Sequence, residues 1–416
     1  MKIVIIADHA HINGGQAKVA IESAKGLAAR GHEVVYFAAV GPADAGLTAA
    51  GVKTIVLGQP DLMSANSLMR FGAQWLWNVE APRRLGEVLG ACDPAGTIIH
   101  VHGWAKALSP SIGPVLKRTA IPRIFTMHEY FLACPNGGFY DFPVAQPCHR
   151  RPMSVACIAH NCDSRNYMRK LMRVARHALL LQSGLLESLG DVITISRLQR
   201  EVLQPYLPPK VRYHEIGNPI DVAPLGPKPP APLGDFIFVG RISAEKGAKI
   251  FAEAARRAGK KAIFVGDGPA AAELQSAYPE AVILGWKSPD DVKTLMRAAR
   301  ALVFPSVWYE GQPLTVLESL ALGTPVIVSD VCAGREAVKD GVNGRWFKSA
   351  DADSLAAALV ELSDEGIART MAQAAYELYW AAPLTLDRHL DALLALYNAA
   401  AGGKDKLTAE AFDASR

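Results

Sequence analysis

Hydrophobic and polar positions follow two periods along the chain. Short β-branched runs predict buried strands, and longer stretches with apolar residues three or four positions apart predict helices. In the first half, the predicted strands are residues 3–7, 33–38, 54–57, 98–101, 123–127 and 192–195, and the predicted helices include 15–30, 82–89 and 106–118. This alternation predicts a parallel sheet with helices on both faces.

The same alternation starts again after a proline-rich break, which favours a linker. Beyond the break, the predicted strands are residues 236–239, 262–265, 282–284, 301–304 and 325–328. A chain of 416 residues also exceeds the size at which one hydrophobic core keeps growing. We therefore expect an α/β protein of two facing Rossmann-like domains, with a ligand cleft between the carboxyl ends of the two sheets.

The predicted first domain covers residues 1–215 and includes a cysteine-rich insertion at 130–165. The second domain is expected at 216–375. A helix at 376–400 is expected to cross back to the first domain, and residues 401–416 to form a flexible tail.

Charged residues and a helix start follow the strand predicted at 301–304. Glu310 lies in the next loop, Pro313 opens a helix, and Glu318 falls on its second turn. A helix start directs free backbone N–H groups and the positive end of the helix dipole at the space above the strand ends. A diphosphate fits there, between the two carboxylates.

Two cations follow the first strand of the second half. Gly240 permits a tight exit from the strand, after which Arg241 and Lys246 can face one anion, the first as a planar fork and the second as a point charge. A solvated basic turn is the alternative for an isolated pair of this kind. Glycine turns after other strands favour a nucleotide site over ordinary turns. These turns contain Gly14, Gly15 and Gly266.

With these motifs the chain resembles a family-four retaining glycosyltransferase of the GT-B fold, over almost its whole length. The motifs that carry the resemblance are Gly14-Gly15, Gly240-Arg241 with Glu245-Lys246-Gly247, and Glu310 to Glu318. It implies transfer of a hexose from a nucleotide-diphosphate sugar, a UDP- or GDP-sugar, to a saccharide acceptor. The implied context is surface polysaccharide biosynthesis (exopolysaccharide, capsule or lipopolysaccharide), with the acceptor carried on a polyprenyl diphosphate.

The resemblance also implies residue roles. Arg241 and Lys246 would hold the donor diphosphate without a metal ion, Glu318 would bind the ribose hydroxyls, and Glu310 would touch the transferred sugar. His128 would lie beside that sugar on the acceptor side, with a buried structural histidine as the alternative. The implied catalytic residues are His128, Arg241, Lys246 and Glu310, and the implied donor site comprises Gly14, Gly15, Gly240, Arg241, Lys246, Gly266, Glu310, Gly311, Gln312, Pro313, Leu314 and Glu318. Family members often carry Phe-Gly where this chain has Gln312-Pro313, so Gln312 could bind a donor hydroxyl.

Two other functions fit parts of the pattern. A nucleotide-sugar epimerase or a phosphorylase on the same frame is the nearest enzyme, and the block from Glu310 to Glu318 counts against it. A non-catalytic subunit that binds a nucleotide or saccharide is the alternative outside enzymes. The presence of Arg241 and Lys246 together with both glutamates argues against it.

Composition limits the partners and the compartment. The net charge of +4 is too small to indicate nucleic-acid binding. The first residues predict a core strand rather than a signal peptide, and no apolar run approaches the ~18 residues of a transmembrane helix. We therefore expect a cytoplasmic protein.

A basic segment at 149–176 raises the question of membrane contact. Its seven cations, set against the single acid Asp163, are Arg150, Arg151, Arg165, Arg169, Lys170, Arg173 and Arg176. Apolar residues between them predict an amphipathic helix on the anionic inner face of the plasma membrane. A helix with one solvated basic face and one core face is the alternative.

Four of the six cysteines lie within 29 residues, in a stretch rich in proline, glycine and asparagine. They are Cys134, Cys148, Cys157 and Cys162. Such an irregular insertion lacks periodic apolar residues, so we expect one structural Zn²⁺ bound by the four thiolates to hold it, with His149 or His160 able to replace one ligand. An iron–sulfur cluster and a set of buried thiols that pack like small hydrophobic residues are the alternatives.

Overall fold

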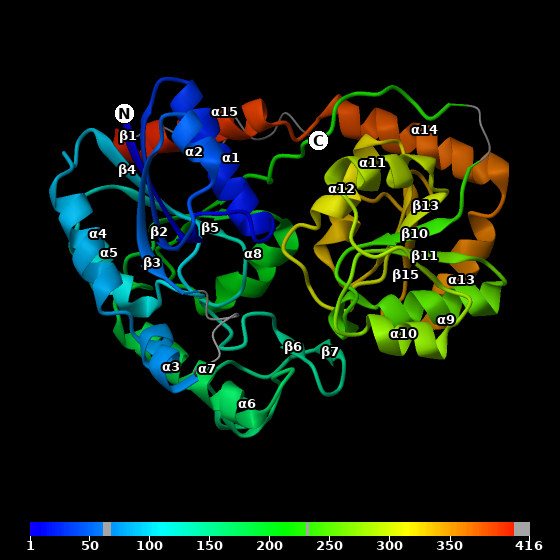
Figure 1. The fold of residues 1–416 in the computed structure, drawn as a ribbon, viewed down its shortest axis with the longest axis horizontal. Helices are drawn as coiled ribbons and strands as arrows, with labels where there is room; N and C mark the ends of the chain where they lie inside the picture. The colour runs from blue at the N-terminus through cyan, green and yellow to red at the C-terminus, as the bar shows by residue number, and fades with distance from the viewer. Residues whose placement is uncertain (61–67, 230–232, 403–416) are drawn as a thin grey trace.

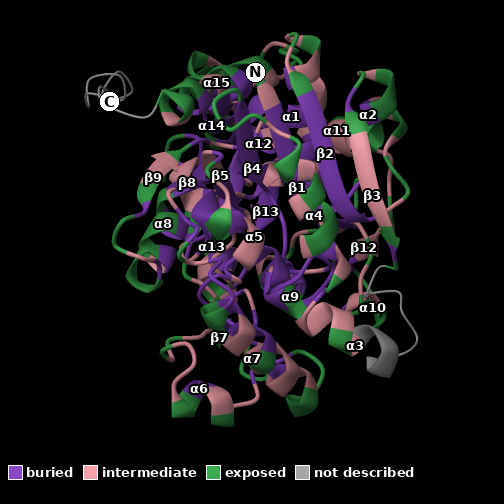
Figure 2. Ribbon diagram, turned by 90° about the vertical axis from the view of Figure 1, so that its left-hand side faces the viewer, coloured by how far each residue is buried: buried purple, intermediate pink, exposed green. Residues whose placement is uncertain are grey.

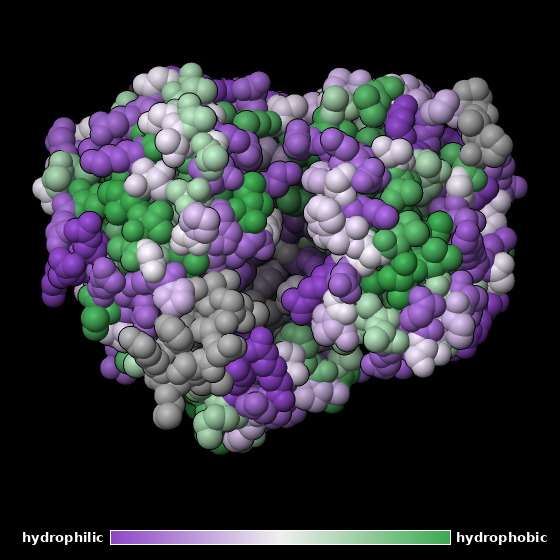
Figure 3. All heavy atoms as spheres, in the orientation of Figure 1, coloured by the Kyte–Doolittle hydropathy of each residue, from purple (hydrophilic) through white to green (hydrophobic). Residues whose placement is uncertain are grey.

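The computed structural model describes residues 1–60, 68–229 and 233–402. Two α/β domains lie side by side and enclose a hollow (Figures 1 and 3). The predicted pair of Rossmann-like domains is confirmed, because each half builds its own parallel sheet with helices packed on it. No helix in the described part of the chain is long and apolar enough to cross a membrane.

The sheet of the first domain has, within the described residues, the strand order β3-β2-β1-β4-β5-β8-β9. All its neighbouring strands are parallel. Ile3 to Ile6 in β1 are fully buried, as a central parallel strand requires. The strands are β1 Lys2–His9, β2 Glu33–Val40, β3 Lys53–Gln59, β4 Thr97–Val101, β5 Arg123–Met127, β8 Asp191–Thr194 and β9 Arg212–Glu215.

The helix predicted at 106–118 is shorter than expected. Only α5, Gly113–Arg118, forms, after a 3₁₀ turn at Pro110–Ile112. The carboxylate of Asp8 accepts the backbone N–H groups of residues 106, 107 and 108, which holds that stretch as a loop. The other helices of this domain are α1 Gly15–Ala29, α2 Ala45–Ala49, α3 Leu68–Leu76, α4 Glu80–Gly90, α6 Val155–Ala159, α7 Tyr167–Gln182 and α8 Arg197–Leu203.

The second domain repeats the plan with the strand order β12-β11-β10-β13-β14-β15. Its strands are β10 Phe236–Val239, β11 Ala262–Val265, β12 Val282–Ile283, β13 Ala301–Phe304, β14 Val326–Ser329 and β15 Gly344–Phe347. Its helices are α9 Ala248–Ala258, α10 Ala271–Ala277, α11 Pro289–Ala298, α12 Leu314–Ala321, α13 Ala352–Glu361 and α14 Glu365–Ala381.

The crossing back to the first domain is made by a separate helix. The single helix predicted at 376–400 is interrupted after Ala381, and a new helix, α15, covers Leu386–Ala401. α14 packs on α12 of the second domain, whereas α15 packs on α1 of the first (Figure 1). A Cβ at Gly26 of α1 would lie 2.4 Å from Leu390 Cδ1, so the two helices touch closely. The predicted tail lies, from residue 403 on, outside the described residues.

The cysteine-rich insertion reaches the second domain (Figure 1). It contains a short antiparallel pair, β6 Tyr140–Asp141 and β7 Gln146–Pro147, followed by α6. A Cβ at Gly138 would lie 3.1 Å from the Trp308 ring of the second domain. The insertion therefore contacts the second domain next to the loop that follows β13.

The basic face predicted for segment 149–176 is wrong for several of its members. Lys170 is fully buried and Arg176 is 3% exposed. The Arg176 guanidinium lies 4.7 Å from the centre of the Phe131 ring, and Arg173 Nε lies 2.9 Å from Asp163 Oδ2. α7 turns these cations inward because they pair with groups of the insertion, which the sequence pattern does not show.

The four cysteines of the insertion do not fit the predicted zinc centre. Across residues 1–60, 68–229 and 233–402 there is no group of three or more His, Cys, Asp or Glu side chains that could hold a metal ion. Instead, Lys170 Nζ lies 3.2 Å from Cys162 Sγ and 3.6 Å from Cys157 Sγ. An ammonium group repels a metal cation, so its contact with two of the four sulfurs is at odds with zinc binding there.

Candidate active site

An ion pair between Lys246 and Glu310 lies next to the insertion, in the second domain. Glu310 Oε1 accepts hydrogen bonds from Lys246 Nζ at 2.6 Å and from Ser306 Oγ at 2.7 Å. The Glu310 side chain is 10% exposed, and its backbone φ of 50° lies in the left-handed region. A non-glycine residue in that region is strained, and such strain concentrates at functional sites.

The first domain holds the same loop from the other side. The Tyr130 hydroxyl donates to the Glu310 carbonyl oxygen at 2.8 Å. Burial raises the pKa of Tyr130, so the hydroxyl keeps the proton that it donates. A Cβ at Gly311 would lie 3.0 Å from Ile195 Cδ1 and 3.4 Å from the His128 carbonyl oxygen. The Glu310 loop therefore packs directly on the end of β5.

Glycines bring the turn after β10 against its neighbours. Gly240 and Gly266 have φ values of 149° and 136°, and a Cβ at Gly266 would lie 2.0 Å from the Gly240 carbonyl oxygen. A Cβ at Gly247 would lie 2.0 Å from the Pro305 carbonyl oxygen. This second approach places Lys246 beside the loop that carries Glu310.

Arg241 takes a different position from Lys246. Its side chain is 63% exposed, and one guanidinium nitrogen lies 3.7 Å from Glu245 Oε1. The Lys246 side chain is 25% exposed, and its ammonium lies 5.3 Å from the centre of the Trp308 ring. Lys246 is therefore held in place, whereas Arg241 is accessible to a ligand.

Two helix N-termini face each other across the cleft. α12 begins after Pro313 and α1 begins after Gly14, and no side chain of the described residues caps either helix. A Cβ at Gly15 would lie 3.5 Å from Leu314 Cδ1, so the two helix starts are close together. Uncapped N–H groups at a helix start bind anions, so this is the part of the cleft best suited to phosphate.

Glu318 and Gln312 differ in whether their side chains have hydrogen-bond partners in the protein. Burial raises the pKa of the Glu318 carboxyl above its usual 4.5, and this side chain has no hydrogen-bond partner among the described residues. Gln312 Oε1 accepts the backbone N–H of Asn218 at 2.7 Å. Gln312 thus fixes the interdomain connection through one hydrogen bond, and its contact with a donor hydroxyl stays a prediction.

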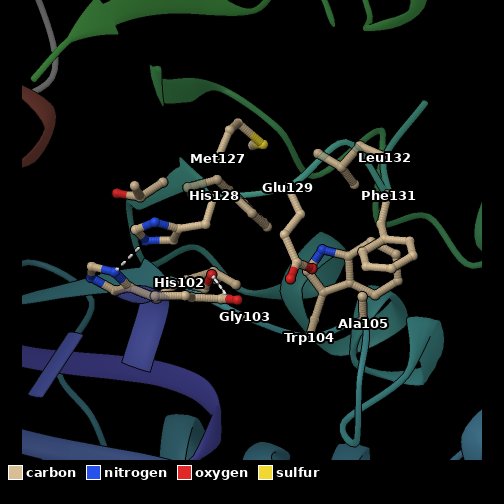
Figure 4. Close-up of a pocket in the computed structure, with 13 residues that line it drawn as sticks. His102, Gly103, Trp104, Ala105, Met127, His128, Glu129, Phe131 and Leu132 are labelled. Atoms are coloured by element: carbon tan, nitrogen blue, oxygen red, sulfur yellow. Dashed lines mark hydrogen bonds between the residues drawn. The ribbon is translucent and has the colours of Figure 1, made fainter. Parts of the chain in front are cut away.

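His128 lies on the first-domain side, at the end of β5. Figure 4 shows it beside a pocket lined by Gly103, Trp104, Glu129 and Phe131, among others. Burial, together with the nearby His389 and Lys106, lowers the pKa of His128 to about 3, so its ring is neutral at pH 7. Lys106 Nζ lies 2.8 Å from Glu129 Oε1 on the same side of the cleft.

The structure places the predicted donor residues on turns and helix starts of the two domains, and it adds three that sequence reasoning missed. Tyr130 and Ser306 hold Glu310, and His102 contacts His128. The signals in the sequence are weak: Tyr130 follows His128 by two residues, His102 ends a His-Val-His stretch at the end of a predicted strand, and Ser306 comes two residues after another predicted strand. The four cysteines belong to the insertion and not to this group.

Comparison with known families gives two matches. The family model described as glycosyl transferases group 1 matches residues 234–365, and the glycosyl transferase 4-like domain matches residues 14–219. Together these matches span most of both domains.

Curated relatives match shorter stretches. The UDP-Gal:alpha-D-GlcNAc-diphosphoundecaprenol alpha-1,3-galactosyltransferase of Escherichia coli is 31% identical over 152 residues, 33% of this chain and 38% of that protein. The N,N'-diacetylbacillosaminyl-diphospho-undecaprenol alpha-1,3-N-acetylgalactosaminyltransferase of Campylobacter jejuni is 32% identical over 144 residues, 33% of this chain and 38% of that protein. The match thus spans little more than a third of either relative.

Solved structures match nearly the whole chain. Sucrose-phosphate synthase from Thermosynechococcus elongatus has a TM-score of 0.68 at 20% identity, covering 95% of this chain and 98% of that one. HepE from Anabaena, in complex with UDP, has a TM-score of 0.64 at 16% identity, covering 95% and 99%. At these identities the likeness shows the shared fold, which confirms the GT-B architecture predicted from the sequence.

Proposed function

We propose that this chain, which belongs to the glycosyl transferases group 1 family, is a retaining hexosyltransferase that uses a nucleotide-diphosphate sugar and a saccharide acceptor. The observation that carries the proposal is the arrangement of the cleft. The Lys246–Glu310 pair lies in the second domain, two uncapped helix starts face each other, and His128 lies on the first-domain side.

The charges of the site suit the departure of a diphosphate. Breaking a sugar–phosphate bond builds negative charge on the leaving group and positive charge on the sugar ring. Fixed positive charge for the leaving diphosphate comes from Lys246, Arg241 and the N–H groups at the start of α12. A single preorganised group of this kind commonly contributes about 3 kcal/mol. Glu310, which pairs with Lys246 in the free protein, supplies negative charge for the positive sugar ring.

The nucleotide end of the donor is assigned to Glu318. Its carboxylate is half-buried and has no protein partner in the described part of the chain, so it is available to accept ribose hydroxyls. A UDP- or GDP-sugar satisfies this requirement. A fold neighbour of known structure, HepE, contains UDP, which supports a uridine nucleotide.

Retention follows from a front-face reaction. The leaving phosphate takes the proton of the acceptor hydroxyl on the face from which it departs, so no protein nucleophile is required. The chain's own cations hold the diphosphate, so no metal ion is required there. Both curated relatives described above are named as alpha-transferases, which supports a defined anomeric outcome.

The acceptor is proposed to be a saccharide on a polyprenyl diphosphate, in the assembly of a surface polysaccharide. The names of both curated relatives specify a sugar linked to diphosphoundecaprenol, which supports this class of acceptor. Such an acceptor lies at a membrane surface, so the enzyme needs a face that reaches the membrane.

The tip of the cysteine-rich insertion is the face proposed for that contact. It carries exposed apolar side chains together with exposed arginines, a combination that favours anionic lipid. Its members, called the insertion tip below, lie around α6 and the start of α7: Val155 at 83% exposure, Met168 at 67%, and the exposed Arg151 and Arg165. Figure 2 shows α6 and the start of α7 projecting from the body of the molecule.

The function is tested by incubating the protein with individual UDP- and GDP-sugars and a mixed saccharide acceptor, with release of free nucleotide as the readout. We expect one donor to release its nucleotide and a new glycoside to form with the anomeric configuration of that donor. Lys249→Ala, which removes a 70% exposed lysine of α9, is a matched control for the Lys246→Ala variant. Release of an epimerised nucleotide sugar, or no turnover of any donor, would contradict the proposal.

A further inference from the structure

Three histidines of the first domain form a hydrogen-bonded chain that ends at the cleft. His102 Nδ1 lies 3.2 Å from His128 Nε2, and His102 Nε2 lies 3.2 Å from His100 Nδ1. His100 lies in β4 and is fully buried, and His102 follows that strand and is 3% exposed. Figure 4 shows the contact between His102 and His128 at the wall of the pocket.

The other end of this series of histidines contacts α15 and β5. The hydroxyl oxygen of Tyr397 lies 2.6 Å from His100 Nδ1, and Thr126 Oγ1 lies 2.7 Å from His100 Nε2. Tyr397 is fully buried, and burial raises its pKa, so its hydroxyl keeps the proton. Burial also lowers the pKa of His100 and His102 well below 6.5, so each ring is neutral, with one N–H and one bare nitrogen.

Two consistent arrangements of the protons are available to such a chain. If Tyr397 donates to His100 Nδ1, His100 directs its Nε2–H at Thr126. The single lone pair of His100 Nδ1 is then taken by Tyr397, and the His102 ring lies tilted by 43° at a centroid distance of 4.0 Å from the His100 ring. His102 Nε2, 3.2 Å from this bare nitrogen, carries the hydrogen because two bare nitrogens at that distance would repel each other. His102 Nδ1 is therefore bare and accepts from the Nε2–H of His128. In the opposite arrangement, every ring carries its proton on Nδ1 and His128 Nε2 is the acceptor.

The two ends of the chain decide between these arrangements. In the opposite arrangement the phenolic hydrogen of Tyr397 has no acceptor among the described residues, and the residue has no exposed surface. A buried donor without an acceptor is strongly disfavoured. In the first arrangement the hydrogen left over is that of Thr126, which lines the pocket and can meet water there.

We propose that Tyr397 is a positioning residue which, through His100 and His102, keeps the proton of His128 on Nε2 and leaves Nδ1 bare. Nδ1 of His128 has no partner among the described residues, so it is available to accept a hydrogen bond from a sugar hydroxyl in the cleft. This consequence for catalysis rests on the proposed function. The arrangement also connects the helix that returns from the second domain to the histidine at the cleft.

The test uses Tyr397→Phe, which removes the hydroxyl and keeps the ring. Tyr36→Phe is the matched control, because Tyr36 is equally buried in the same layer of the core and donates to the His9 carbonyl oxygen at 3.1 Å, outside the histidine chain. Nitrogen NMR of the imidazole rings reports the tautomer in the nucleotide-free protein, with His128→Gln used to assign the signals.

We expect His128 to carry its proton on Nε2 in the unmodified protein and in Tyr36→Phe, and to become a mixture of tautomers in Tyr397→Phe. The same variant should lower kcat by about 10-fold and leave the donor KM within about twofold. A proton on Nδ1 in the unmodified protein, or an unchanged tautomer in Tyr397→Phe, would overturn the inference. If the unmodified protein transfers no sugar, the proposed function fails, and the tautomer measurement still decides this inference.

Discussion

Lys246 and Glu310 are joined by a 2.6 Å ion pair, although 64 positions separate them in the chain. One comes from the turn after β10 and the other from the loop after β13, which are neighbouring strands. A diphosphate that enters this site competes with Glu310 for the lysine ammonium. The free protein therefore keeps Lys246 in place with a partner that the donor is expected to displace.

Lys246→Ala and Arg241→Ala should each lower transfer by about 10²-fold or more, because each removes positive charge from the departing diphosphate. Melting temperatures close to that of the parent protein, together with the Lys249→Ala control, would show that the loss is local. Near-normal turnover in both variants would remove the proposed donor site.

Glu310→Gln and Glu318→Gln should separate in their effects. Glu318 is assigned to the ribose, a contact that exists before the transition state, so its variant should raise the dissociation constant of the free nucleotide. Glu310→Gln should instead lower kcat without raising that dissociation constant, because Glu310 faces charge that develops on the sugar and competes with the diphosphate for Lys246 in the free protein. Titration calorimetry and steady-state kinetics would distinguish the two, and the reverse pattern would exchange the roles.

Acid pH should weaken nucleotide binding through Glu318. Burial raises the pKa of this carboxyl above 4.5, so the group loses its charge at a higher pH than an ordinary glutamate does. The free energy of unfolding has its own pH dependence. Because the pKa of Glu318 is higher in the folded state than in the unfolded state, the folded state holds this proton more tightly. The resulting stabilisation is complete below the unfolded-state pKa and is lost as pH rises through the folded-state pKa. Nucleotide affinity should instead rise with pH, because the ionised carboxylate is the form that accepts the ribose hydroxyls. Glu318→Gln should flatten the pH dependence of the nucleotide dissociation constant, which titrations at several pH values would measure.

The sequence predicted the central strands of both large sheets and one edge strand of each, β3 and β12, but missed the strands at the opposite edges. β9 and β15 escaped prediction because Arg212 and Arg345 interrupt their apolar pattern and their residues are partly exposed. The insertion was harder, because its cations resemble a solvated helix face. The burial of Lys170 depends on the packing of thiols from other segments against α7, which no local pattern contains.

The candidate site could be predicted as far as its glycines and charges. The turn at Gly240 and the start of α12 have local signals, a glycine directly after a strand and a proline directly before a helical pattern. The hydrogen bond from Tyr130 to Glu310 joins residues 180 positions apart and depends on how the two domains meet. The hydrogen bond from the Asn218 backbone N–H to Gln312 Oε1 also depends on that interface.

The sequence predicts a zinc centre in the insertion, whereas the structure places Lys170 against two of its cysteines. The metal content of the protein distinguishes the two. We expect well under one Zn per chain in protein purified without a histidine tag, because Lys170 already lies against two of the four sulfurs. Elemental analysis measures this directly. About one Zn per chain, lost in a Cys157→Ser variant, would restore the predicted centre.

EDTA should leave transfer unchanged, because Lys246, Arg241 and the start of α12 supply the positive charge at the diphosphate. The measurement is the initial rate of nucleotide release with and without the chelator. An activity that disappears, and that Mg²⁺ or Mn²⁺ restores, would show that the diphosphate is held by a metal ion instead.

The insertion tip should bind anionic vesicles, and the change Val155→Ser with Met168→Ser should weaken that binding. Both side chains are more than two-thirds exposed and make little contact with the core, so the folded structure should be kept. Arg151→Gln with Arg165→Gln tests the charge contribution, which should fall as salt rises because screening weakens it. Leu225→Ser, at a residue of the second domain that is 57% exposed, is the matched control. Co-sedimentation with vesicles containing phosphatidylglycerol is the measurement, and donor hydrolysis in solution should stay unchanged in every variant. Equal sedimentation of the parent protein and the tip variants would show that the insertion tip does not contact the membrane.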